Sequence, residues 1–158
     1  VMTSFPTMRE TRKKGLKINY ISIDEIPEIL LEKRKTEAGY INISTPILTA
    51  ADLVQFERRI GGLNRAVTIL DELLEVISES DFSEEFLNCT PVTVLQRLGY
   101  LLEFICHSTQ LSDALFAALA ENNIRLFRIP LKSSRQAKGY SSENRWKVIV
   151  NVEIDPDL

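Results

Sequence analysis

Hydrophobic side chains recur at every third or fourth position through the middle of the chain, which is the spacing of one buried helix face. The clearest stretch carries such a stripe at Leu63, Ala66, Val67, Leu70, Leu73, Leu74 and Ile77. Two further stretches, residues 94–105 and 111–119, show the same spacing. The pattern therefore predicts a layer of amphipathic helices.

Polar residues, proline and glycine mark the ends of these helices. Thr49 followed by Asp52 resembles a capping box, which predicts a helix start there. Gly61–Gly62 then breaks the chain before the clearest helix. Thr90 followed by Pro91 predicts a helix start, with Thr90 as the N-cap and Pro91 as the first helical residue. Proline is tolerated there because the N–H groups of the first turn have no partner within the helix, so the N–H that proline lacks is not needed.

Gly99 lies in the middle of the stripe at 94–105. A glycine inside a helix costs about 1 kcal/mol relative to alanine. We therefore predict that another backbone or a large ring packs closely against the helix at this position.

Alternation of apolar and polar residues, the period of a half-buried strand, appears on both sides of the helices. Before them it covers residues 16–20 and 40–43, and after them residues 126–131 and 146–154. Strands on both sides of a helical block favour an α+β domain, with a helical layer packed on a small, mostly antiparallel sheet. The residues expected to be buried together are Leu70, Leu73, Leu98, Leu102 and Trp146. Two charged stretches, 33–39 and 81–88, are expected to be connections.

Length and composition fit one globular domain: the chain has 158 residues, of which 44% are apolar. We expect residues 1–14 to be a linker or a loose first strand and residues 15–158 to be the domain. No signal peptide and no membrane span is evident, which favours the cytoplasm. The chain begins at Val1 rather than at methionine, and we expect a further segment upstream.

The residue types that carry catalysis are sparse. His107 directly follows Cys106, and neighbouring helical residues point about 100° apart, so they make a poor dyad. A single histidine and two distant cysteines make a zinc site improbable. Gly61–Gly62 precedes a helix but lacks the lysine of a phosphate-binding loop. We predict a non-enzymatic chain with no catalytic residues, no metal and no cofactor.

Basic residues cluster locally, although the formal net charge is −3. They surround the double glycine and fill the segment between the last two predicted strands. The candidate contacts to a partner or to nucleic acid are Arg58, Arg59, Arg65, Arg97, Lys132, Arg135, Lys138, Arg145 and Lys147. A positive patch for phosphates and scattered solubilising charge both explain this pattern.

Four segments resemble motifs of one family, in the family's order. They are residues 43–54 (ISTPILTAADLV), 61–73 (GGLNRAVTILDEL), 95–103 (LQRLGYLLE) and 144–151 (NRWKVIVN). The chain is similar here to the AbiEi antitoxins of type IV toxin–antitoxin systems, which act in bacterial phage defence by abortive infection. Ile47 departs from the motif, since the family usually has glutamate there.

The resemblance implies two functions for the full-length protein. A winged helix–turn–helix at its N-terminus binds the operon's own promoter, and the C-terminal domain counters the nucleotidyltransferase toxin AbiEii. The present chain corresponds to the C-terminal domain, so the resemblance implies the toxin as functional partner and promoter DNA through the other domain. No membrane partner is implied.

A winged-helix DNA-binding module is the alternative. Residues 90–121 predict helix, turn and helix, and residues 126–154 predict strand, loop and strand, which is the order of a winged helix. The second helix, however, carries Ser112, Asp113 and Glu121 and no basic residue. It is poorly suited to a groove lined by phosphates.

Overall fold

A computed structural model describes residues 1–4, 6 and 8–155 of the chain. The chain groups into two compact units, Val1–Leu31 and Glu32–Leu158. Residues 5, 7 and 156–158, which belong to the predicted linker and domain, lie outside the described residues. The division into a linker (1–14) and a domain (15–158) stays a prediction.

The first unit consists of short paired strands. β1 (Met2–Thr3) pairs in parallel with β4 (Ile21–Ser22), and β2 (Thr11–Lys13) pairs antiparallel with β3 (Leu16–Ile18). A turn at Lys14 and Gly15, both with positive φ, joins β2 to β3. The strand predicted at 16–20 is therefore present over its first three residues.

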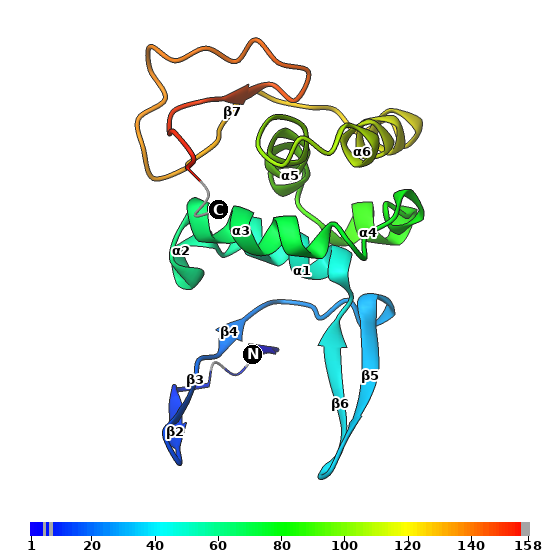
Figure 1. Cartoon of the computed structure of the whole chain (residues 1–158), viewed down its shortest axis with the longest axis vertical. Coiled ribbons are helices and arrows are strands. Elements are labelled where there is room, and N and C mark those ends of the chain that lie inside the picture. Colours follow the sequence, from blue (N-terminus) through cyan, green and yellow to red (C-terminus); the bar gives the residue numbers. More distant parts are fainter. Residues whose placement is uncertain (5, 7, 156–158) are drawn as a thin grey trace. The chain divides into compact units, whose positions relative to one another are not determined.

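The second unit is built on helices. They are α1 (Pro46–Gln55), α2 (Glu57–Ile60), α3 (Leu63–Leu73), α4 (Glu84–Cys89), α5 (Val92–Phe104) and α6 (Thr109–Glu121). Helix α1 packs against α3 and α5, and α5 packs against α6 (Figure 1). Together with the two-stranded sheets, these helices confirm the predicted α+β class.

The longest strands, β5 (Leu31–Thr36) and β6 (Gly39–Ser44), are hydrogen-bonded neighbours. Two residues join them, which is the connection of an antiparallel hairpin. The prediction that 33–39 is only a charged turn is therefore wrong. Its charged residues lie on a strand that is exposed along most of its length, so periodic burial does not reveal the strand in the sequence.

Two predicted helix starts are displaced in the structure. Helix α1 begins at Pro46, and the Thr45 side chain accepts a hydrogen bond from the Leu48 N–H. The capping box predicted at Thr49 is wrong: the Thr49 hydroxyl donates to the Thr45 carbonyl at 2.9 Å, as an interior threonine does. Helix α5 begins after Pro91, and the Thr90 hydroxyl is buried without a partner rather than capping it.

One helix was not predicted. Residues 81–88 were expected to be a connection, but α4 occupies most of that stretch. Ser83 caps α4 by accepting from the Phe86 N–H at 3.3 Å, and Phe86 and Leu87 are buried. The helix is too short to show a full apolar stripe in the sequence, so its cap is the only local signal.

The core forms where α5 meets the C-terminal segment. Leu70, Leu98, Leu102 and Trp146 are buried as predicted, whereas Leu73 is half-buried because α3 ends there. A Cβ placed on Gly99 would lie well under 3.0 Å from the Trp146 ring. The close approach of a large ring predicted at Gly99 is therefore confirmed.

The last two predicted strands are reduced to two residues each. β7 (Ile129–Pro130) and β8 (Val148–Ile149) pair in parallel. The alternation predicted over 146–154 is wrong, because adjacent Val148 and Ile149 are both buried and Lys147 has a φ of 55°. A strand cannot continue through a left-handed residue.

Side chains replace the missing sheet hydrogen bonds in this segment. The buried Gln96 amide donates to the Phe127 and Trp146 carbonyls, at 2.6 Å each. The buried Asn151 side chain accepts from the Lys132 N–H and donates to the Lys132 and Arg135 carbonyls. Gln96 thus fixes the segment to α5, and Asn151 holds two parts of the segment together.

Candidate functional site

The two groups of basic residues, far apart in sequence, meet in the second unit. Arg58 and Arg59 lie in the last turn of α2, and an Arg58 terminal nitrogen is 3.4 Å from the Ser133 hydroxyl. Ser133 belongs to the segment that carries Lys132, Arg135 and Lys138. The fold therefore joins the predicted basic clusters through this contact.

Arg97 comes to the same place from α5. Its Nε donates to the Pro130 carbonyl at 3.0 Å, which fixes the direction of the guanidinium. Burial lowers the pKa of Arg97, and the charge of Glu57 opposes this by favouring the cation. Arg97 is thus a half-buried cation close to a carboxylate.

A pocket of about 160 Å³ lies between these residues. Its walls come from the junction of α1 and α2, from α5 and from the segment after β7; they are Val54, Gln55, Phe56, Glu57, Arg58, Arg59, Arg97, Leu131 and Ser133. Glu57 is buried, and one of its carboxylate oxygens has no hydrogen-bond partner. We call this site the α1–α2 pocket.

The remaining predicted contact residues do not line the pocket. Arg65 is exposed on α3, with its aliphatic carbons over Gly61. Lys132, Arg135 and Lys138 belong to the segment held by Asn151, with the side chains of Arg135 and Lys138 exposed. Lys147 donates to the Leu126 carbonyl at 3.3 Å.

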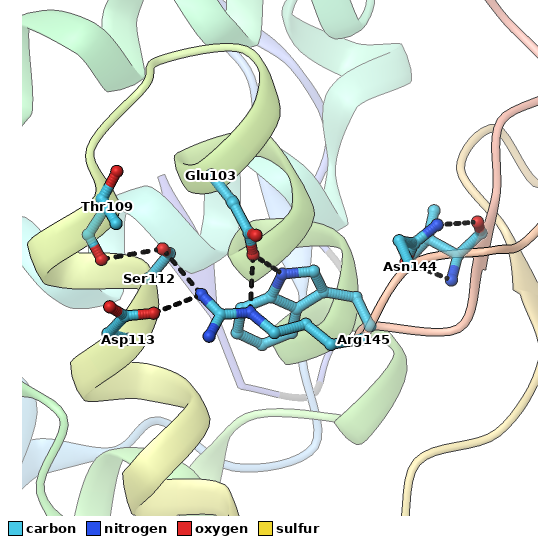
Figure 2. A network of polar contacts seen from close by, with 8 residues as sticks. Glu103, Thr109, Ser112, Asp113, Asn144 and Arg145 are labelled. Carbon is cyan, nitrogen blue, oxygen red and sulfur yellow. Dashed lines mark hydrogen bonds and ion pairs between the residues drawn. The ribbon is translucent and has the colours of Figure 1, made fainter.

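Arg145 is used inside the fold (Figure 2). It donates to Glu103 at 2.7 Å, to Asp113 at 2.6 Å and to the Ser112 hydroxyl at 3.0 Å. Burial by itself would lower the pKa of Arg145, but the hydrogen bonds to Asp113 and Glu103 outweigh it and raise that pKa. Arg145 is therefore the least suited of the nine residues to contact a partner.

Trp146 shares the same carboxylate. Its indole N–H donates to Glu103 at 2.7 Å, and the Arg145 guanidinium lies 5.3 Å from the centre of the Trp146 ring and 4.9 Å from that of Phe116. Such cation–π contacts attract a guanidinium to the electron-rich faces of aromatic rings. The arrangement fastens the C-terminal segment to α5 and α6.

The residues considered for catalysis do not converge. His107 is exposed just after α5, and burial together with the charge of Asp71 raises the pKa of Cys106 to about 12. A thiol with so high a pKa is a weak nucleophile at neutral pH. Among residues 1–4, 6 and 8–155, no group of three His, Cys, Asp or Glu side chains is placed to hold a metal ion.

The alternative of a winged helix loses its structural basis. A wing is a hairpin of antiparallel strands, whereas β7 and β8 run parallel.

In the part of the chain that the structure describes, no helix has the length and apolar character needed to cross a membrane.

Sequence reasoning missed the acidic members of both clusters. Glu57, Glu103 and Asp113 occur among other charged residues. Arg145, which pairs with two of them, lies 42 positions after Glu103 and 32 positions after Asp113. Ser133 was missed for the same reason, since its partner Arg58 is 75 positions away. No local pattern indicates contacts of this kind.

Comparison with known proteins gives one finding. The model of a protein family described as the AbiEi antitoxin C-terminal domain matches residues 23–104. The match covers just over half of the chain and includes α1 to α5, and hence Glu57, Arg58 and Arg97. No curated protein and no solved structure matches the chain.

Proposed function

Because this chain belongs to the AbiEi antitoxin C-terminal domain family, we propose that it antagonises a nucleotidyltransferase toxin of the AbiEii type. The family match over residues 23–104 carries the antitoxin role, and the family is not an enzyme family. The chain then acts by binding rather than by catalysis, in the cytoplasm where such a toxin works. In the full-length protein it supports transcriptional autorepression, with promoter DNA held by a winged helix–turn–helix.

The basic surface around the α1–α2 pocket is the proposed working surface. It is cationic on a chain whose formal net charge is −3, and it draws on α2, α5 and the loop after β7. Positive charge concentrated in this way favours phosphate groups or an acidic protein face. Arg97 contributes from within one of the family-like segments, residues 95–103.

The loop after β7 allows the charge of this surface to be changed without altering the backbone contacts. Lys132 and Arg135 are held by their backbone groups through Asn151, and Lys138 is exposed. Reversing the charges of these three side chains therefore changes the surface while leaving the backbone contacts in place.

The experiment is co-expression of the full-length protein with its toxin, with growth as the readout. We expect Arg97→Ala and the triple change Lys132→Glu, Arg135→Glu and Lys138→Glu to lose rescue. The matched control reverses the exposed charges of β5 at positions 33–35 and should rescue fully.

Circular dichroism first confirms that each variant is folded. Full rescue by both folded variants would refute the basic surface as the working surface. It would direct attention to the exposed acidic residues Asp71 and Glu72 at the end of α3 and Glu75 in the turn that follows. Loss of rescue by the control as well would assign the effect to net charge alone.

A further inference from the structure

The α1–α2 pocket combines three features that match the parts of one small ligand. It has guanidinium groups from two directions, one buried carboxylate, and an aromatic and aliphatic wall. All of its lining residues lie within the second compact unit. A ligand bound in this pocket would therefore contact residues of one folded unit only.

The three arginine side chains that line the pocket, Arg58, Arg59 and Arg97, are placed to bind an anion. Arg97 uses Nε on the Pro130 carbonyl, and no bond from its two terminal nitrogens is found among the described residues. Arg58 and Arg59, with largely exposed side chains, border the same pocket. Arginine groups presented in this way bind phosphate by paired, charge-assisted hydrogen bonds.

Glu57 supplies the second feature. The residue is 8% exposed, yet its Oε2 atom has no hydrogen-bond partner, and its Oε1 atom is 3.7 Å from the Arg58 Nε. Buried carboxylate oxygens are normally satisfied by a donor. An amino or hydroxyl group on a ligand would provide that donor.

Val54, Phe56 and Leu131 form the apolar part of the wall. An aromatic ring beside a phosphate-binding group is a stacking surface for a nucleobase. An inorganic anion would use neither this wall nor Glu57.

We propose that the α1–α2 pocket binds a free nucleotide. Its phosphate lies on Arg97 and the α2 arginines, a hydroxyl or amino donor reaches Glu57, and the base packs against Phe56. This goes beyond the proposed antitoxin function and does not depend on it, because the ligand is bound by the chain alone.

The test is calorimetric titration of the purified 158-residue chain with AMP, GMP, pyrophosphate and a short 5′-phosphorylated oligonucleotide. We expect a mononucleotide to bind, and Arg97→Gln to weaken it at least about tenfold, as expected for losing a hydrogen bond to a charged group. The matched control, Arg125→Gln, removes the same charge from an exposed position outside the pocket and should leave binding unchanged.

Glu57→Gln separates a nucleotide site from a simple anion site. It removes negative charge, so pyrophosphate should bind more tightly, while the preference for the nucleotide over pyrophosphate should fall. If Arg97→Gln does not fold, Arg97→Lys keeps the charge and should still weaken the nucleotide, since lysine lacks the planar fork.

Four results would overturn the proposal. They are absence of mononucleotide binding, equal weakening by the Arg97 and Arg125 variants, an unchanged nucleotide-to-pyrophosphate ratio in Glu57→Gln, and tighter binding of the oligonucleotide through the same residues. The last result would assign the pocket to nucleic-acid ends instead.

Discussion

Replacing Gly99 by alanine tests the packing of the core with a single methyl group. If helix propensity alone mattered, Gly99→Ala would stabilise α5 by about 1 kcal/mol. The structure predicts the opposite sign. The added Cβ would lie well under 3.0 Å from ring atoms of Trp146, which is completely buried.

The size of the destabilisation depends on the interactions that the Trp146 ring loses when it moves. Overpacking of this kind costs about 1–3 kcal/mol. Moving the ring also strains the hydrogen bond from the Trp146 indole to Glu103, a bond to a charged group that contributes about 1.5–3 kcal/mol. After subtracting the propensity gain, we expect destabilisation of about 2–4 kcal/mol.

Thermal and urea unfolding of Gly99→Ala would measure this loss, with an expected fall in Tm of about 5–15 °C. Trp146 is the only tryptophan, so near-ultraviolet circular dichroism reports the state of that ring directly. In a Trp146→Phe background the smaller ring leaves room, and Gly99→Ala should cost at least about 1 kcal/mol less. A raised Tm with an unchanged tryptophan signal would refute the packing argument.

Two further predictions concern buried polar groups. Gln96→Ala leaves the Phe127 and Trp146 carbonyls without their donor and should destabilise the chain by about 2–4 kcal/mol, with hydrogen exchange of Ile129 and Leu131 accelerating first. Amide exchange rates at Ile129 and Leu131 equal to those of wild type would show that the hydrogen bonds of the Gln96 side chain do not stabilise this segment. Burial raises the pKa of Asp52 from 3.8 to about 6. Between these two pH values the folded chain binds more protons than the unfolded chain, so the free energy of unfolding falls as the pH rises through this range. Asp52→Asn should remove this slope and, because the carboxyl is partly solvated, stabilise the chain at pH 7 by only about 1–2 kcal/mol, as chemical denaturation at several pH values would reveal; a slope equal to that of wild type would contradict the assignment.

The helices α3, α5 and α6 were predictable because each buries one face, and one-sided burial leaves a repeat of three and four residues in the sequence. Gly99 was informative for a related reason: a residue that is unfavourable in an isolated helix implies a partner that requires it. Two of the four family-like motifs, residues 61–73 and 95–103, fall on α3 and α5, so the same stretches of sequence indicated both the family and the helical layer.

The C-terminal segment and the α1–α2 pocket were decided by tertiary structure. Alternation at 146–154 predicts a strand, but amide side chains from Gln96 and Asn151 take over the backbone bonds, and Lys147 turns the chain into a left-handed conformation. The pocket arises only when Arg58 meets Ser133 across 75 positions of sequence. Local periodicity records which face of an element is buried, whereas the partner of a buried charge depends on how distant segments pack. The sequence alone therefore determined the helical layer, and only folding brought Arg58, Arg59 and Arg97 into one site.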